Sequence, residues 1–334
     1  MKTDNLDELW IEIESKYSSD RRNYQRMICT DLLYRVYIGI AGIPSKRFVS
    51  VEIPEEEEKE FDSFDIPQGF TVSINEPQVK HEGYVSCVLE STTSELNDVF
   101  TVVVENILFE LRKHKNTTDY ISVLKERIEK WREFFRNPRK KKLSDSEVVG
   151  LMGELSFLNT LYANDISSGI DMWNGPVKAA QDFQCSTVAV EIKTSSANTL
   201  ESVRISSEIQ LDNDGRDALF LGVYRVAQND KSGLTLPDLI TEISSRMTIH
   251  QKERFMAKLL CLGYYEEDRD YYNKGYIVSE PVFYRIEEEF PRLTKSVLPK
   301  GVYNTIYSLS LSECIDFKVE IDDVLQSVKE YDNG

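Results

Sequence analysis

Hydrophobic and polar residues alternate in four short segments of the first third of the chain, as they do in half-buried β-strands. Glycine, proline or acidic turns separate these segments, and an amphipathic helix is expected before them, in MKTDNLDELWIEIESKY. The pattern therefore predicts a helix followed by strands at residues 34–42, 46–53, 69–76 and 83–91.

Helical periodicity replaces the alternation in the next part of the chain. Apolar residues recur at helical spacing over residues 94–113 and again over residues 119–135. The Asn137-Pro138 step then interrupts the pattern, because a residue that precedes proline avoids the helical region. We therefore expect a β-rich N-terminal domain with two closing helices over residues 1–140.

A second block opens with a strong helix start at Ser144. Ser144 and Glu147 have the spacing of a capping box directly before an apolar run, which predicts a helix over residues 145–162. Further helices are expected at 237–247 and 251–262. Strands are expected at 217–226, 275–286 and 302–311. This order predicts an α+β or α/β domain over residues 141–334, with a mixed β-sheet flanked by helices.

The segment DFQCSTVAVEIKTSS, residues 182–196, places three charged residues among short apolar ones. If residues 188–194 form a strand, alternate side chains face opposite sides of the sheet. Glu191 and Lys193 then share one face, about 6–7 Å apart along the strand. The alternative is an ordinary amphipathic hairpin whose charged residues face water.

The residues before this strand complete the arrangement. A return through the two-residue loop Ser186-Thr187 pairs Cys185 with Val188 and places Asp182 opposite Glu191, about 5 Å away. Two opposed carboxylates repel each other unless a cation lies between them. Mg²⁺ prefers carboxylate, carbonyl and water oxygens, so this register predicts a metal site.

A fourth group is expected from the helix at 145–162. Glu154 lies at the edge of its apolar face, and Gly150 and Gly153 interrupt the helix at a cost of about 1 kcal/mol each. Close approach of another backbone, a phosphate or a metal shell would explain the two glycines. The alternative is ordinary helix–sheet packing with Glu154 at the boundary.

The motif Glu191-Ile192-Lys193 has competitors elsewhere in the chain. Acid-x-Lys also occurs in Glu14-Ser15-Lys16, in an acidic loop at residues 57–59 and in Asp316-Phe317-Lys318. Asp316 follows a strand-like run, but no acid stands at hairpin distance before it. Only residues 191–193 combine an apolar strand with an opposing aspartate.

Charge and composition narrow the chemistry. The net charge of −17 argues against a protein that coats DNA indiscriminately, because nucleic-acid binding depends on neutralising phosphates. Residues 51–65 carry eight acids and one lysine, whereas residues 136–142, RNPRKKK, carry five bases and no acid. Each run is also typical of a solvated surface loop.

Cysteine and histidine usage excludes other classes of site. The five cysteines and three histidines are scattered, which predicts reduced structural thiols and no zinc site. Acid–base chemistry would then use carboxylates, lysines or a bound metal. No apolar run approaches the ~18 residues of a membrane span, and the acidic N-terminus is unlike a signal peptide, so a cytoplasmic location is expected.

Together these residues resemble a known group of enzymes. Glu154 in GLMGELSFL, WNGP at 173–176, Asp182-Phe183 and EIKTS at 191–195 resemble the PD-(D/E)xK nuclease superfamily. More closely, they resemble a bacterial family of PD-(D/E)xK motif proteins encoded beside restriction–modification and other phage-defence genes. The similarity is strongest over residues 143–226 and continues weakly through residues 205–211.

The resemblance implies a restriction-endonuclease-like core and a role for each matching residue. Asp182 and Glu191 would be metal ligands for Mg²⁺, for which Mn²⁺ would substitute. Lys193 would position or activate water, and Glu154 would be an auxiliary ligand. The chain departs from the motif in one place, since Gln181 replaces the proline that shapes the start of the strand.

The leading hypothesis is a Mg²⁺-dependent DNA endonuclease, a restriction-type effector in anti-phage defence. A homodimer is expected because cutting both strands needs two sites, and an ATPase or methyltransferase partner is possible. The alternatives are a nuclease-like DNA-binding or scaffold subunit without activity, or a nuclease acting on RNA or branched DNA. The residues expected to contact DNA are Arg139, Lys140, Lys141, Lys142, Thr194, Ser195 and Gln210.

Overall fold

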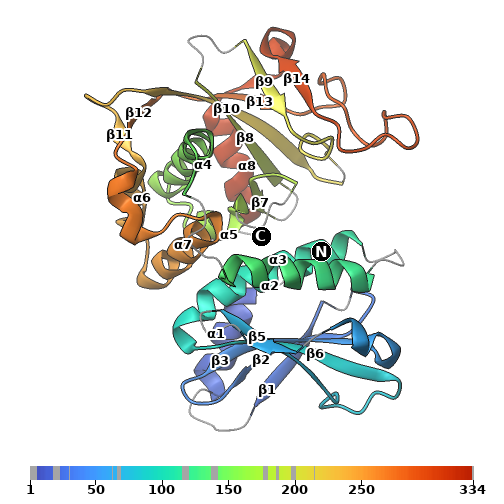
Figure 1. The fold of residues 1–334 in the computed structure, drawn as a ribbon. Helices are drawn as coiled ribbons and strands as arrows, with labels where there is room; N and C mark the ends of the chain where they lie inside the picture. The colour runs from blue at the N-terminus through green and yellow to red at the C-terminus, as the bar shows by residue number, and fades with distance from the viewer. Residues whose placement is uncertain are drawn as a thin grey trace. The chain divides into compact units, whose positions relative to one another are not determined.

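The chain divides into two units, residues 2–141 and residues 142–334. The structure is a computed structural model (Figure 1). It describes residues 6–17, 23–29, 31–61, 63–65, 69–114, 120–136, 142–175, 180–185, 188–196, 201–213 and 215–332.

The first unit is an antiparallel sheet with three helices. The sheet has the strand order β1-β2-β3-β6-β5-β4, and the helices cover one of its faces (Figure 1). Its elements are α1 (Leu6–Tyr17), β1 (Tyr24–Ile28), β2 (Val36–Ala41), β3 (Lys46–Pro54), β4 (Phe64–Asp65), β5 (Phe70–Asn75), β6 (Tyr84–Ser91), α2 (Asn97–Lys113) and α3 (Tyr120–Arg136).

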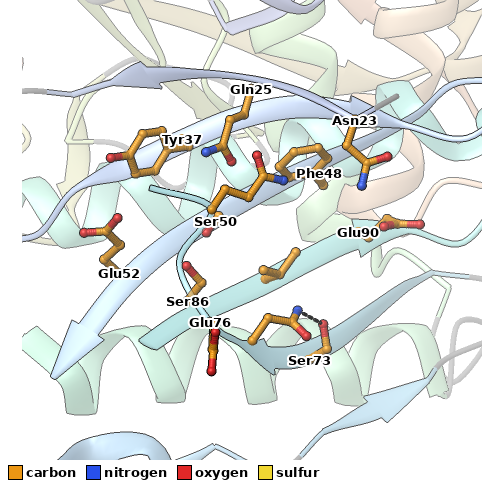
Figure 2. Close-up of a pocket in the computed structure, with 13 residues that line it drawn as sticks. Asn23, Gln25, Tyr37, Phe48, Ser50, Glu52, Ser73, Glu76, Ser86 and Glu90 are labelled. Atoms are coloured by element: carbon orange, nitrogen blue, oxygen red, sulfur yellow. Dashed lines mark hydrogen bonds between the residues drawn. The ribbon is translucent and has the colours of Figure 1, made fainter. Parts of the chain in front are cut away.

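The opposite face of this sheet is hollowed where short side chains meet. Ser50, Ser73 and Ser86 lie on β3, β5 and β6 and line a hollow of about 330 Å³ (Figure 2). The described residues that line it include three glutamates but neither lysine nor arginine. Such a lining disfavours an anionic ligand, so we place no phosphate contact there.

The second unit is built on a mixed sheet. The long strand β10 pairs in parallel with β8 on one edge, and β8 pairs antiparallel with β7. Its elements are α4 (Asp145–Ala163), α5 (Gly169–Met172), β7 (Phe183–Cys185), β8 (Val188–Ser195), β9 (Ser202–Ile205), β10 (Ala218–Gln228), β11 (Leu234–Thr235), α6 (Leu236–Ser244), α7 (Ile249–Leu262), β12 (Gly275–Val278), β13 (Val282–Arg285), β14 (Tyr307–Ser310), β15 (Lys318–Val319) and α8 (Ile321–Asp332).

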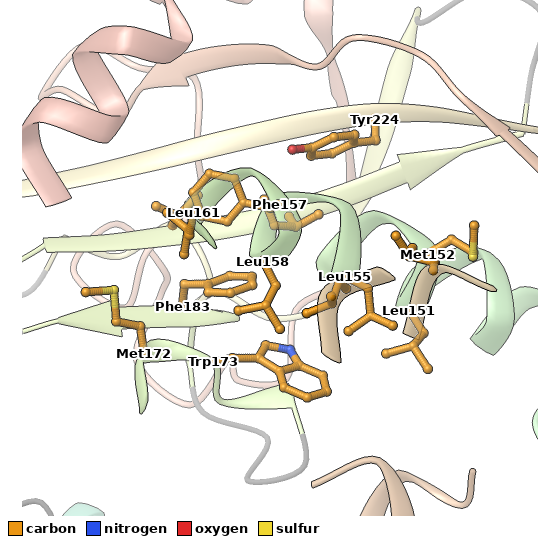
Figure 3. Packing of buried hydrophobic residues seen from close by; sticks show 14 of the residues in the cluster. Leu151, Met152, Leu155, Phe157, Leu158, Leu161, Met172, Trp173, Phe183 and Tyr224 are labelled. Carbon is orange, nitrogen blue, oxygen red and sulfur yellow. The ribbon is translucent and has the colours of Figure 1, made fainter. Parts of the chain in front are cut away.

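This sheet is buried on both faces. Val190 and Phe220 join one core with helices α4, α6, α7 and α8, part of which is shown in Figure 3. Ala189, Leu221 and their neighbours join a second core with β9 and β14. Strand β8 is therefore apolar on both sides except at its charged positions, as is typical of a central parallel strand.

The predicted strand at residues 275–286 is two strands. β12 and β13 follow one another along the same edge of β10, with Val278 opposite Val226 and Val282 opposite Val223. Three residues ending in Pro281 lie between these pairs, against two residues on β10. Proline cannot donate a ladder hydrogen bond, so the strand bulges there.

The alternation predicts the longer elements and misses the short ones. The helices expected at 94–113, 119–135 and 145–162 correspond to α2, α3 and α4, and a mixed α+β fold is confirmed. The prediction missed β1, β4, β9, β11, β15, α5 and α8. Among the described helices, none combines the length and apolar character needed to cross a membrane.

Candidate active site

The hairpin at the centre of the second unit has the predicted register. Cys185 pairs with Val188, and Phe183 pairs with Val190. Asp182 directly precedes β7, and its carbonyl oxygen accepts a hydrogen bond from the Asn174 amide at 2.7 Å. The predicted loop residues Ser186 and Thr187 lie outside the described part of the chain.

Three charged side chains of this hairpin lie together. Asp182 Oδ2 accepts a hydrogen bond from the Ile192 amide at 2.7 Å, which ties the aspartate to β8. Lys193 Nζ donates to Glu191 Oε1. The Glu191 side chain is 1% exposed and that of Lys193 15% exposed. The second oxygen of Glu191, Oε2, is buried and has no hydrogen-bond partner among the described residues.

Helix α4 brings Glu154 to the same place. The Ser144–Glu147 capping box is present at its start, as predicted. Gly153 allows the helix to lie against β8, because a Cβ there would come within 2.3 Å of Thr194 Cγ2. Gly150 has a different environment, since a Cβ there would meet no atom within 4 Å. The close approach explains Gly153 but not Gly150.

The carboxylates are held in an environment that opposes their ionisation. Burial, followed by repulsion from Asp182, raises the pKa of Glu191 to about 8 although Lys193 acts in the other direction. Burial and the charge of Asp182 also raise the pKa of Glu154 well above its ordinary value. The Asp182 pKa is raised mainly by burial.

Lys193 is the cation that offsets this charge. Burial opposes its charged form, but the nearby carboxylates of Glu191 and Asp182 hold its pKa above the ordinary value. The mutual effects among Lys193, Asp182, Glu191 and Glu154 show that all four side chains are electrostatic neighbours. We refer to these four residues as the charged cluster.

A chain of hydrogen bonds supports Glu154. Trp173 Nε1 donates to Glu154 Oε2 at 2.8 Å, and the indole is fully buried (Figure 3). Lys258, 1% exposed, donates from Nζ to the carbonyl oxygens of Trp173 at 2.6 Å and Ile170 at 2.8 Å. A Cβ on Gly175 would come within 2.8 Å of Glu154 Oε2.

Gln181 supports the other side of the charged cluster. It stands where the motif has proline, and its buried Nε2 donates to the carbonyl oxygens of Ile209 at 3.0 Å and Gln210 at 3.2 Å. The side chain thus ties the segment before Asp182 to residues 209–210. This contact gives the departure from the motif a structural role.

The donor set fits a hard divalent cation in its chemistry. Three carboxylates lie near one another, and the buried, unpartnered Oε2 of Glu191 is an oxygen without a protein donor. Among the described residues, however, no three Asp, Glu, His or Cys side chains are arranged so that they could hold a metal as they stand. The Ile192 amide, Lys193 and Trp173 now engage the carboxylates, so side-chain rearrangement would accompany binding.

The basic run that is predicted to contact DNA, residues 139–142, is described only at Lys142. Lys142 lies 3.1 Å from Asp268 and over the Tyr271 ring, and no contact among the described residues links it to the charged cluster. Arg139, Lys140 and Lys141 lie outside the described residues.

The remaining candidates lie on β8 or in the segment that Gln181 contacts. The Thr194 side chain packs on Gly153. Gln210 Oε1 accepts a hydrogen bond from the backbone amide of Ser206 at 2.8 Å, so both side chains have structural contacts. Ser195 ends β8 and is half-buried. The rival Asp316 is exposed in a 3-10 helix, away from any strand pair of this kind.

Sequence reasoning missed the supporting residues Gln181, Trp173 and Lys258. Trp173 was available as a tryptophan in the WNGP segment, and Lys258 as the lysine on the apolar side of a predicted helix. Neither signal points to a partner, because the contacts join residues at least 19 positions apart.

Comparison with known proteins agrees with this geometry. The chain belongs to the family described as "Putative PD-(D/E)XK family member, (DUF4420)", whose model matches residues 6–312. The expected superfamily and its restriction-endonuclease-like fold class are confirmed. No curated protein and no solved structure matches the chain significantly.

Proposed function

From its membership of this nuclease-like family, we propose that the chain is a Mg²⁺-dependent DNA endonuclease that hydrolyses phosphodiester bonds. One observation carries the proposal: buried Glu191, with a carboxylate oxygen left unpartnered, lies beside Asp182, Glu154 and Lys193. Buried carboxylates that repel one another destabilise a fold unless a cation or a reaction requires them.

Each residue of the charged cluster has a role in this proposal. Asp182 and Glu191 would hold Mg²⁺, with Glu154 as an auxiliary ligand. The metal would supply a water of lowered pKa and screen the phosphate charge. Lys193 would hold the attacking water at Nζ, and Trp173 would orient Glu154 through its indole N–H.

The wider role follows from the chemistry and from the family resemblance. Cutting both strands of a duplex requires two sites, so we propose a homodimer acting on double-stranded DNA in the cytoplasm. We propose a restriction-type effector in anti-phage defence, which an ATPase or methyltransferase from the same locus would regulate. The nuclease chemistry is assigned to residues 141–334.

The direct test is cleavage of supercoiled plasmid DNA by the purified protein. We expect nicked and linear products with Mg²⁺ or Mn²⁺ and intact plasmid with EDTA, because the carboxylates need a cation between them. Methylated and unmethylated plasmids should be compared. Tight duplex binding without cleavage of either plasmid would contradict the proposal and indicate a DNA-binding subunit instead.

Trp173→Phe should weaken Mg²⁺ binding about tenfold, because loss of a group that orients a metal ligand typically costs this much or more. The indole N–H lowers the Glu154 pKa, so its loss should also move metal binding to higher pH. Titration calorimetry from pH 6 to pH 9 measures both effects.

Trp131→Phe provides a matched control for this experiment. Trp131 Nε1 also donates to a buried side chain, Asn106 Oδ1 at 3.0 Å, but in the first unit. This variant should bind Mg²⁺ like the parent. Equal metal affinity and equal pH dependence in both variants would mean that Trp173 has only a packing role.

A further inference from the structure

Strand β10 carries a basic residue in line with the charged cluster. β10 runs parallel to β8, with Val223 paired with Lys193 and Arg225 paired with Ser195. Paired residues of a parallel sheet project from the same face, and alternate residues share that face. Leu221 and Val223 lie in the core on the side of Glu191, so Arg225 projects from the face of Glu191 and Lys193.

The spacing places Arg225 close to the charged cluster. It lies two residues beyond Lys193 on the neighbouring strand, which corresponds to about 8 Å between the two Cα atoms. Exposure increases in the same direction along β8, from the buried Glu191 to the half-buried Ser195 and the exposed Ser196. A ligand that enters from this open end would pass Arg225 before it reaches Lys193.

Arg225 is half-buried, its Nε has no hydrogen-bond acceptor, and no acid pairs with it among the described residues. The Nε atoms of Arg127, Arg132 and Arg254 are also buried without an acceptor, but each of these three arginines has an acidic partner. Arg47, which is 3% exposed, is likewise paired with Asp7, Glu14 and Asp98. A half-buried guanidinium without an anion is costly, and binding an anion would remove that cost.

We propose that Arg225 binds a backbone phosphate of the DNA strand, next to the phosphate that is cut. This inference rests on the proposed function and adds the residue that anchors the substrate strand. A guanidinium recognises phosphate through two parallel N–H donors, and a phosphate contact fixes the position of the strand without reading its sequence. The three carboxylates would otherwise repel the strand, so a cation at this edge is needed to position it.

The test measures duplex binding in a background that cannot cut. In the Glu191→Gln protein, Arg225→Gln should weaken binding of a fluorescent 20-base-pair duplex about tenfold at 0.1 M salt. The slope of log affinity against log salt should fall by about 0.9, the value for one phosphate contact. Arg225→Lys keeps the charge and should retain the parental slope while binding more weakly.

Arg285→Gln is the matched control. Arg285 lies on the neighbouring strand β13 and pairs with Phe220 of β10. Phe220 belongs to the helix-side core, so Arg285 lies on the face of the sheet opposite to Arg225. Its loss should leave affinity and slope unchanged. Circular dichroism and the unfolding midpoint establish that each variant is folded.

The outcomes separate the two proposals. Equal salt slopes for parent, Arg225→Gln and Arg285→Gln would overturn the role of Arg225 and leave the nuclease proposal standing. If Arg225→Gln does not fold, Arg225→Lys takes its place: weaker binding with the parental slope supports the phosphate contact, and parental affinity overturns it. A parent that binds no duplex DNA would overturn the proposed function and this inference with it.

Discussion

Glu191→Gln should reduce Mg²⁺-dependent cleavage about 1000-fold or more and, in the metal-free protein, raise the unfolding midpoint at pH 8. Cleavage falls because the amide is a poor ligand for a hard cation and removes the charge that would hold it. Stability rises because glutamine fills the same space without a charge next to Asp182. A variant that loses activity and gains stability indicates a functional site whose charged groups destabilise the folded chain.

The pH dependence of this gain follows from the Glu191 pKa. That pKa is about 8 in the folded chain, against an ordinary value of 4.5. Between these values the unfolded chain has lost the proton while the folded chain keeps it, so the parent loses stability as pH rises. The advantage of Glu191→Gln should be absent below about pH 4.5, grow up to pH 8, and then level off at about 5 kcal/mol.

Thermal unfolding with and without Mg²⁺ measures both parts of this prediction. Mg²⁺ should raise the midpoint of the parent at pH 8 and leave that of Glu191→Gln unchanged. Glu52→Gln serves as a control, since Glu52 is similarly buried, at 2% exposed, but lies 2.6 Å from His81 and 3.9 Å from Arg35. It should lose stability and keep cleavage. Cleavage retained by Glu191→Gln would remove this residue from the site.

Gly153→Ala should destabilise the second unit by about 2 kcal/mol and reduce cleavage about 100-fold. The added methyl group would lie 2.3 Å from Thr194 Cγ2, so α4 must move away from β8. Glu154 follows Gly153 on this helix and would move with it. A displacement of about 1 Å is enough to lower the rate of a positioned reaction by this factor.

Two companion variants test whether the clash is the cause. The double variant Gly153→Ala, Thr194→Ser lacks the Thr194 methyl group that would clash with the new Cβ at position 153, and it should recover most of the lost stability. Gly150→Ala should instead stabilise the protein by about 1 kcal/mol, because its new methyl group meets open space and alanine favours the helix. Chemical denaturation of the three variants gives the comparison. Equal effects of Gly150→Ala and Gly153→Ala would exclude the proposed contact.

The part of the site that follows from local spacing was predictable from the sequence. Strand alternation put Glu191 and Lys193 on one face, and the short return to Cys185 fixed the pairing that the structure contains. The capping box located the start of α4 and therefore the position of Glu154 along it. Each of these inferences uses residues fewer than about ten positions apart, for which geometry is set by the secondary structure itself.

The remaining features depend on contacts between distant segments. The sequence offers the same explanation for Gly150 and Gly153, although only Gly153 lies against a strand. It gave no partner for Trp173 or Lys258, because a hydrogen bond between them exists only after helix α7 has packed on the segment before β7. Arg225 was read as part of a buried strand, and its relation to Lys193 follows only from the parallel pairing of β8 with β10.

The crowded burial of β8 has a consequence for how the protein can change over generations. Val190 and Ile192 fill one core and Ala189 the other, so these positions accept few replacements. Glu191 is different, because a single substitution to glutamine would give a more stable protein. In a lineage released from selection for cleavage, such substitutions would be retained readily, and the carboxylates would be among the first residues to disappear. Under the proposed function, selection for cleavage would oppose this loss and keep Asp182, Glu191 and Glu154 together.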